Sequence, residues 1–212
     1  MEKKLESLVT HLIKDGYLKT PRIIRAFQII DRKDFMAPEY ADYAYINEAF
    51  SIGHGQTISQ PLTVAFMLEL LAPEVGEKIL DVGSGSGWTT ALSAFIVSQN
   101  SMNYESRIMN KGRIWVFGVE KIPELVEFGR KNLAKYNFPN AQIFPADKDL
   151  GLSKEAPYDK ILVSAAAESI PHELIDQLKV GGRMVIPVGH SIFKIEIISK
   201  VKPDEIYNLG AQ

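Results

Sequence analysis

The stretch 79–87 reads Ile-Leu-Asp-Val-Gly-Ser-Gly-Ser-Gly and is typical of a ligand-binding turn. Ile79 and Leu80 look like the end of a buried strand, and residues 88–97 are patterned as a helix. Glycines between a strand and a helix let the backbone approach a ligand, and the helix N-terminus offers free N–H groups. The stretch therefore predicts a nucleotide-type binding site. A turn that binds nothing is the alternative, but three glycines cost stability unless something needs the space.

The spacing of the glycines does not fit the dinucleotide-binding pattern. Gly83, Gly85 and Gly87 are spaced Gly-x-Gly-x-Gly, whereas the dinucleotide pattern Gly-x-Gly-x-x-Gly would need glycine where Trp88 stands. Asp81, just before them, either orients the loop, faces an amino group of the ligand or only caps the turn.

Two acids stand where neighbouring strands are expected to end. Glu120 follows one predicted strand, and in a doubly wound fold a carboxylate there accepts hydrogen bonds from the ribose hydroxyls of an adenosine. It lies 33 residues after Gly87 (120 − 87), and the polar stretch 98–112 accounts for the excess over the usual gap of about 20. Asp147 follows the next strand, where it could accept a hydrogen bond from an adenine amino group. The alternatives are a solvent-facing Glu120 and a turn-forming Asp147.

Residues 53–61 read Gly-His-Gly-Gln-Thr-Ile-Ser-Gln-Pro, a polar and glycine-bearing segment that is too irregular to predict a strand. Pro61 is expected to open a helix, with Ser59 or Gln60 near its N-cap. Ser59 is therefore either a cap of this helix or a residue whose hydroxyl belongs to the ligand-binding site. His54 is expected to be a turn residue rather than a base. The histidines have no ligand-like spacing, so we expect no metal.

Composition limits the classes of function. The chain has 212 residues, 46% of them hydrophobic, which suits one α/β domain with a sizeable core. A net charge of −2 gives no sign of a nucleic-acid surface. The lack of cysteine excludes disulfides, zinc thiolate sites and cysteine nucleophiles. No run of 18 apolar residues and no signal peptide is found, so we expect a cytoplasmic monomer that binds neither membranes nor nucleic acids.

The order of elements predicts the fold. Strand and helix patterns alternate after residue 60, which implies an α/β protein with a doubly wound, mostly parallel Rossmann-like sheet and ligands at the carboxyl ends of its strands. Residues 1–60 are expected to form a helical extension that packs over those ends, and residues 61–212 the α/β core of the same domain. The predicted strands are 78–82, 113–119, 141–144, 160–164, 183–188 and 193–200, the last near an edge. The predicted helices are 2–15, 21–30, 61–71, 88–97, 123–136 and 171–179, and 98–112 is expected to be a surface loop.

Residues 18–200 resemble the protein-L-isoaspartate O-methyltransferase family, which belongs to the class I methyltransferases that use S-adenosylmethionine. An Asp followed by Gly-x-Gly-x-Gly is similar to motif I of that class. The segment 53–61 resembles a stretch particular to the family. Residues 117–125, 156–167 and 178–189 resemble its later motifs, and residues 21–35 its N-terminal helix and Arg-x-Phe end in altered form.

The resemblance implies a repair reaction. A methyl group would pass from S-adenosylmethionine, leaving S-adenosylhomocysteine, to the carboxylate of an L-isoaspartyl residue in a damaged protein or peptide. The ester would then close to a succinimide that partly reopens to aspartyl. The carboxylate is ionised near neutral pH, so no general base is required and catalysis would be mainly alignment. The resemblance implies that the Ser59 hydroxyl contacts this carboxylate. Together with the glycine loop, it implies a donor site made by Thr57, Ile58, Gln60, Asp81, Gly83, Ser84, Gly85, Gly87, Glu120, Lys121, Asp147 and Lys148.

The chain departs from the family pattern in three places. Ala146-Asp147-Lys148 stands where the family has Gly-Asp-Gly, the loop 98–112 is longer than usual, and the chain ends about where a final family strand begins. These departures leave open a protein that binds the donor but has lost turnover. A class I methyltransferase that acts on a small molecule or RNA is disfavoured by the segment 53–61 and by the lack of a basic surface. A nicotinamide dehydrogenase is disfavoured by the glycine spacing.

Overall fold

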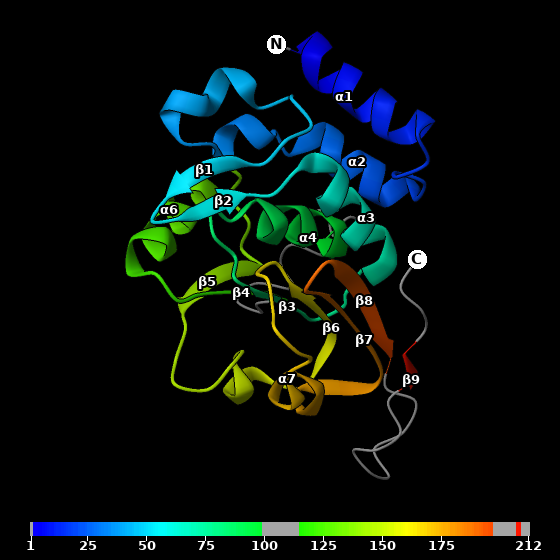
Figure 1. Ribbon diagram of the computed structural model, residues 1–212, viewed down its shortest axis with the longest axis vertical. Coiled ribbons are helices and arrows are strands. Elements are labelled where there is room, and N and C mark those ends of the chain that lie inside the picture. Colours follow the sequence, from blue (N-terminus) through cyan, green and yellow to red (C-terminus); the bar gives the residue numbers. More distant parts are fainter. Residues whose placement is uncertain (1, 99–114, 197–206, 209–212) are drawn as a thin grey trace.

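A seven-stranded sheet forms the centre of the computed structural model, which describes residues 2–98, 115–196 and 207–208 (Figure 1). The strand order is β5-β4-β3-β6-β7-β8-β9. Neighbours from β5 to β7 run parallel, and β8 and β9 are antiparallel to their neighbours. The strands are β3 (Ile79–Val82), β4 (Val116–Glu120), β5 (Ala141–Pro145), β6 (Tyr158–Val163), β7 (Leu178–Val188), β8 (Ser191–Glu196) and β9 (Tyr207–Asn208). Because β3 lies between β4 and β6, the strand order reverses at β3, where doubly wound sheets bind their ligands.

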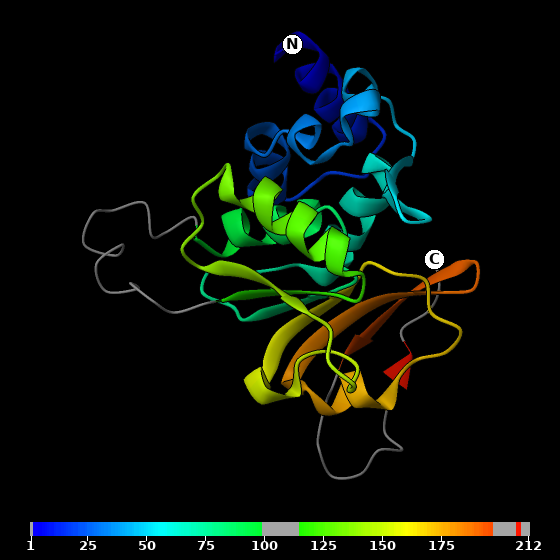
Figure 2. The ribbon, with the colours of Figure 1, turned by 90° about the vertical axis from the view of Figure 1, so that its left-hand side faces the viewer.

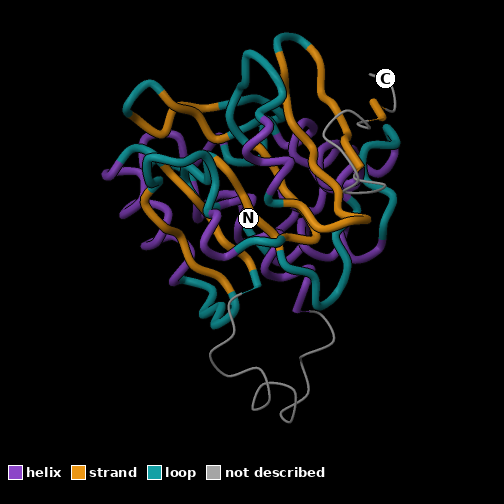
Figure 3. The backbone as a smooth tube through the Cα atoms, turned by 90° about the horizontal axis from the view of Figure 1, so that it is seen from below, coloured by secondary structure: helices purple, strands orange, loops and turns teal. Residues whose placement is uncertain are grey.

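Helices cover both faces of this sheet, as a doubly wound fold requires. Three lie on one face, namely α3 (Pro61–Leu71), α4 (Trp88–Ser98) and α6 (Pro123–Ala134), and α7 (His172–Asp176) lies on the other (Figures 1 and 2). Seen from below, the strands cross in front of the helical layer (Figure 3). The predicted fold class is confirmed. Among the described helices, none is long and apolar enough to cross a lipid bilayer.

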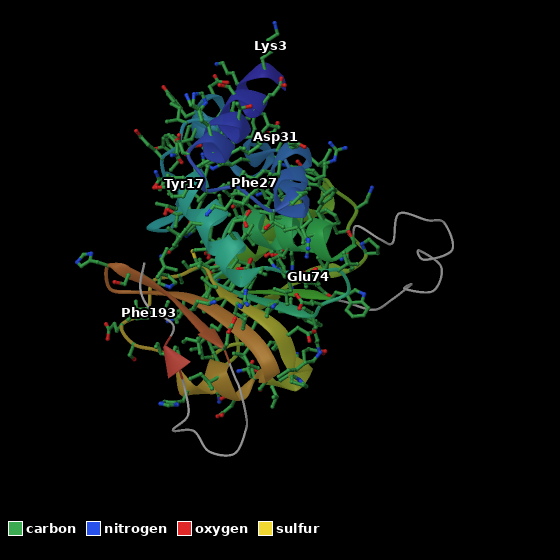
Figure 4. All side chains as sticks on the ribbon, turned by 90° about the vertical axis from the view of Figure 1, so that its right-hand side faces the viewer. Lys3, Tyr17, Phe27, Asp31, Glu74 and Phe193 are labelled. Carbon is green, nitrogen blue, oxygen red and sulfur yellow. The ribbon has the colours of Figure 1, made fainter. Side chains whose placement is uncertain are left out.

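The N-terminal residues build a further layer on top of α3, α4 and α6. This layer contains α1 (Glu2–Lys14), α2 (Pro21–Ile29) and the 3-10 helices η1 (Arg32–Phe35) and η2 (Pro38–Tyr43) (Figure 2). The rings of Phe27 on α2 and Trp88 on α4 pack in a T-shaped arrangement, with their centres 5.6 Å apart. Figure 4 labels Phe27 and Asp31 in this layer, and Phe193 on β8 in the sheet. The expectation that all of residues 1–60 cover the strand ends was too broad, because most of the layer packs on helices.

The start of α2 shows how this layer is attached. Thr20 is the N-cap residue, but its side chain makes no cap bond within α2. The Glu69 carboxylate of α3 instead accepts hydrogen bonds from the backbone N–H groups of Lys19 and Thr20, each at 2.8 Å, and from the Thr20 hydroxyl at 2.7 Å. A neighbouring helix thus satisfies the donors at the helix start.

Residues 50–58 form a β-hairpin, so the prediction that this region contains no strand was wrong. Strand β1 (Phe50–Gly53) pairs with β2 (Gln56–Ile58) in antiparallel fashion. The two turn residues His54 and Gly55 both have positive φ, 54° and 71°. Such a turn matches the right-handed twist of paired strands, which explains a hairpin in a segment that carries little strand pattern.

The region after β6 also differs from expectation. The predicted helix 171–179 is shortened to α7, and β7 begins at Leu178 rather than at residue 183. Gly181 and Gly182 therefore lie inside a strand whose pairing with β6 is irregular. The other predicted helices and strands are present with small shifts at the ends that the structure describes, whereas residues 113–114 and 197–200 of two predicted strands lie outside the described residues. Apart from Ser98, the predicted loop 98–112 lies outside the described residues.

Candidate functional site

A cavity of about 760 Å³ lies at the carboxyl ends of β3, β4, β5 and β6. Its volume is within the range of about 300–1,000 Å³ that is usual for small-molecule sites. The hairpin forms one wall through Ile52, Gln56 and Thr57. The other lining residues are Val82, Gly83, Gly85, Val119, Glu120, Lys121, Ile122, Ala146, Asp147, Lys148, Asp149, Leu150, Gly151, Ser164 and Ala165.

The glycine loop borders this cavity in a conformation that favours glycine. The φ angles of Gly83, Gly85 and Gly87 are 78°, 50° and 85°, a region that other residues seldom adopt. A Cβ on Gly83 would lie 2.8 Å from the Ala165 side chain, and one on Gly87 would lie 3.0 Å from the Gly129 carbonyl oxygen. The loop is thus pressed against the end of β6 and against α6, so its glycines serve protein packing as well as access for a ligand.

Glu120 lies at the end of β4, as predicted, and its carboxylate binds three backbone N–H groups. Oε2 accepts from Gly85 at 2.9 Å, and Oε1 accepts from Lys121 at 2.7 Å and Ile122 at 3.0 Å. The residue is only 7% exposed, yet it lines the cavity. The Glu120 carboxylate therefore joins the glycine loop to the segment that leads into α6, beside the space that a ligand would fill.

Asp81 lies beneath the loop and lines neither cavity at the site. Oδ2 accepts hydrogen bonds from the hydroxyls of Thr89 (2.6 Å) and Thr90 (2.7 Å), and Oδ1 accepts one from Ser164 (2.7 Å). The side chain is completely buried, which raises the pKa of its carboxyl group. The three hydroxyl donors oppose this rise, and the nearby charge of Glu120 adds to it. This environment favours the alternative in which Asp81 orients the loop, because its contacts join the start of α4, directly after the loop, to the end of β6.

The outer rim of the cavity carries charged residues. Asp147 is exposed, and its Oδ1 accepts the backbone N–H of Lys148 at 2.8 Å. Lys121 lies on the same rim and is also exposed. The two lysines and the aspartate could therefore meet the polar edge of a bound ligand, while Ile122 and Leu150 offer apolar surface.

Ser59 borders a second, smaller cavity of about 30 Å³. Ile58, Ser84, Trp88 and Thr89 also line this cavity. Ser59 is half-buried, and within the described residues its hydroxyl makes no hydrogen bond. The N-cap of α3 is Gln60, so Ser59 is not the cap residue. The two cavities share the residues Thr57, Gly83, Gly85 and Ser164, so the smaller one adjoins the larger.

Gln60 and Gly87 line neither cavity, although the sequence placed both at the donor site. The Gln60 amide turns away from the cavities: Nε2 donates to the carbonyl oxygen of Asn47 at 2.9 Å, and Oε1 accepts from the Thr63 hydroxyl at 3.4 Å. Gly87, the last glycine of the loop, lies against Gly129 of α6. The remaining expected residues, apart from the buried Asp81, line one cavity or both.

Some residues at the site were missed by the sequence reasoning. Ser164 follows β6 and lines both cavities, and the rule that ligands meet the carboxyl ends of strands could have identified it. Gln177 gave no such signal. It is buried, and its amide accepts from the Leu152 N–H at 2.9 Å and donates to the Leu150 carbonyl oxygen at 2.8 Å. Gln177 thereby holds the segment that forms the outer wall of the large cavity.

The donor set and the shape suit a nucleoside-type ligand with a small acceptor group beside it. Carboxylates at Glu120 and Asp147 can accept hydrogen bonds from hydroxyl and amino groups, and apolar side chains separate them. The described lining residues include no histidine, so a proton-transfer role for an imidazole finds no candidate in them. The arrangement suits a reaction that depends on alignment of two bound groups.

Comparison with known proteins agrees with this geometry. The model of the family described as "Protein-L-isoaspartate(D-aspartate) O-methyltransferase (PCMT)" matches residues 3–208. A protein-L-isoaspartate O-methyltransferase of Methanococcus aeolicus is 39% identical over 210 residues, which cover 99% of this chain and 91% of that protein. One from Aeropyrum pernix is 41% identical over 198 residues, 93% of this chain and 71% of that protein.

The same fold occurs in a solved structure. A putative protein-L-isoaspartate O-methyltransferase of Plasmodium falciparum, crystallised with S-adenosyl-L-homocysteine, superposes with a TM-score of 0.78. The match covers 97% of this chain and 94% of that chain at 24% identity, which establishes similarity of fold.

We expect replacement of Asp81 by asparagine to change how stability depends on pH. Burial raises the pKa of Asp81, so the folded protein holds the proton more tightly than the unfolded chain. The resulting stabilisation is present below the ordinary aspartate pKa and is lost as the pH rises through the folded-state value. Because asparagine resembles the protonated acid, the wild type should lose free energy of unfolding relative to Asp81→Asn as the pH rises above about 4, the ordinary value for an aspartate. Urea unfolding at several pH values measures this, and a gap that stays constant with pH would contradict it.

Proposed function

This chain belongs to the protein-L-isoaspartate(D-aspartate) O-methyltransferase family, and we propose that it transfers the methyl group of S-adenosylmethionine to the side-chain carboxylate of L-isoaspartyl residues in damaged proteins and peptides. The observation that carries the proposal is the adjacency of the two cavities. The larger suits the nucleoside of the donor, and Ser59 lines the smaller, which adjoins it. Methyl transfer needs a donor and an acceptor held side by side in this way.

The residues around the large cavity fit the donor. Glu120 would accept hydrogen bonds from the ribose hydroxyls and Asp147 one from the adenine amino group, while Lys121 and Lys148 lie at the rim. Thr57, Gly83 and Gly85 border both cavities and so stand closest to the position where the two substrates meet. Asp81, Gly87 and Gln177 would act on the donor site indirectly, through the loops that they hold.

S-adenosylmethionine, when bound, supplies a methyl group activated by a positively charged sulfur. The isoaspartyl carboxylate oxygen forms the new bond to the methyl carbon, the carbon–sulfur bond breaks, and its electron pair goes to sulfur. No proton has to move, because the carboxylate is already ionised near neutral pH. The Ser59 hydroxyl is proposed to donate a hydrogen bond to the carboxylate oxygen that does not react and so to orient the other. The hairpin would exclude water from this contact.

A comparison of two peptides tests the reaction. The wild-type protein should methylate a peptide that contains L-isoaspartate and leave the same peptide with normal aspartate unmethylated, as measured by transfer of a labelled methyl group. Equal labelling of both peptides would indicate another substrate class. Binding of S-adenosylhomocysteine without labelling of either peptide would indicate a donor-binding protein that has lost turnover, for which Lys148 in place of the family's glycine would be the first residue to examine.

We further propose that the protein acts as a cytoplasmic monomer. Light scattering of the purified protein tests the oligomeric state, and fractionation of the source cells tests the location.

Glu120→Ala should weaken binding of S-adenosylhomocysteine. Loss of hydrogen bonds to a charged group costs about 1–3 kcal/mol, which corresponds to roughly five- to 150-fold in the dissociation constant. Titration calorimetry measures the effect. Glu124→Ala removes an equal charge from an exposed position in the first turn of α6 and serves as the control. Equal affinity of the Glu120 variant and the wild type would remove Glu120 from the donor site.

Ser59→Ala should fold and bind the donor normally but turn over on the order of a hundredfold more slowly, because alignment of the carboxylate is lost. Single-turnover methyl transfer at saturating donor, together with a melting curve, measures this. Ser51→Ala, an exposed serine on the same hairpin, is the matched control and should remain close to wild type. Near-normal turnover by the Ser59 variant would assign the alignment to another residue of 53–60.

A further inference from the structure

The guanidinium of Arg32 joins the two ends of the β1–β2 hairpin. Nη1 donates hydrogen bonds to the carbonyl oxygens of Ala44 (2.9 Å) and Ile46 (3.3 Å). Nη2 donates to those of Glu48 (2.8 Å) and Ser59 (3.1 Å). Residues 44–48 lead into β1 and Ser59 follows β2. A single side chain therefore binds the backbone on both sides of the hairpin that covers the site.

The same guanidinium also lies against the element that follows the glycine loop. Its Cζ is 5.4 Å from the centre of the Trp88 ring and 5.7 Å from that of Phe50. Trp88 comes directly after Gly87, and Phe50 is the first residue of β1. Arg32 therefore links the backbone of Ser59 to the start of α4.

Arg32 keeps its charge in a place that does not favour one. Its side chain is completely buried, and none of the ion pairs among the described residues includes it. Burial lowers its pKa to about 10, which still leaves the group protonated at neutral pH. Nε makes no hydrogen bond within the described residues. Four backbone carbonyl groups and the rings of Trp88 and Phe50 stabilise the buried charge. An apolar side chain would fill the same space at a lower desolvation cost.

We propose that Arg32 is a positioning residue for methyl transfer, because its hydrogen bond to the Ser59 carbonyl and its contact with Trp88 fix the Ser59 hydroxyl relative to the donor cavity. This proposal rests on the proposed function, since it assigns Ser59 to the acceptor. The planar fork of a guanidinium presents donors on two separate nitrogens and can reach carbonyls on both sides of the hairpin. A lysine has its donors on one nitrogen and cannot span them.

The test compares wild type with Arg32→Lys, which keeps the charge, and Arg32→Met, which removes it at similar length. Both variants should bind S-adenosylhomocysteine with nearly wild-type affinity by calorimetry. The turnover number for an isoaspartyl peptide should fall on the order of ten- to a hundredfold, because small misplacements of reacting groups have effects of that size. Hydrogen–deuterium exchange should become faster at residues 50–58 and stay unchanged in α4. Each assay is run at a temperature where the melting curve shows the variant fully folded.

Tyr136→Phe is the matched control for loss of stability in the same layer. The Tyr136 hydroxyl accepts the Asp31 backbone N–H at 2.8 Å and donates to Asp34 Oδ2 at 2.7 Å, so it holds the residues on either side of Arg32 without touching the hairpin. This variant should melt at a lower temperature but keep wild-type turnover and wild-type exchange at residues 50–58.

The outcomes distinguish this role from the proposed function. If the wild type itself fails to methylate the peptide, the proposed function is rejected. If the wild type is active and both folded Arg32 variants match it in turnover and hairpin exchange, Arg32 has no positioning role. The role is also rejected if turnover falls only in proportion to the unfolded fraction, as in the tyrosine control, or if neither Arg32 variant folds.

Discussion

The buried carboxylate of Asp81 is the interaction on which the geometry of the site depends. It stands at the end of the central strand β3 and accepts hydrogen bonds from hydroxyls on α4 and after β6. The end of β6, 83 residues along the chain from Asp81, thus meets the consecutive elements β3 and α4 at one carboxylate. Within the described residues no cation pairs with it. Short hydroxyl bonds in a dry interior are strong and directional, which suits a group that must fix a loop.

The glycine loop connects β3, which carries Asp81, to Trp88, which the guanidinium of Arg32 contacts. Asp81 binds hydroxyls in the first turn of α4, just after the loop, and Arg32 contacts Trp88 at the same point. Glu120 accepts the Gly85 N–H within the loop. Each of these charges is satisfied by neutral backbone or hydroxyl groups. Neutral partners can be oriented by the fold without placing a second full charge near the reacting carboxylate. The site therefore combines a rigid floor with a polar but sparsely charged interior.

The order of elements and the glycine loop could be predicted because their signals are local. Helix and strand periods extend over many residues, and Gly83 to Gly87 need conformations that favour glycine. The hairpin was missed because strands of four and three residues are too short to display alternation, and its turn depends on a left-handed His54. The local sequence pattern also could not predict where a side chain points. Gln60 is next to Ser59 in sequence, yet its amide donates to the carbonyl oxygen of Asn47. Arg32 and Gln177 act across long sequence separations, so only the tertiary structure reveals their partners.

The attachment of the N-terminal layer determines when that layer can be completed during synthesis of the chain. The ring of Phe35 stacks on that of Tyr136 with their centres 5.7 Å apart, and the Asp31 N–H binds the Tyr136 hydroxyl. Asp31 and Phe35, in the first fifth of the chain, can therefore complete their packing only after α6 and Tyr136 have been synthesised. Strand β3 likewise gains its second neighbour only with β6. A nascent chain stopped before residue 136 would contain α3 and α4, on which α2 packs, but would leave the Phe35 ring of η1 without its partner Tyr136.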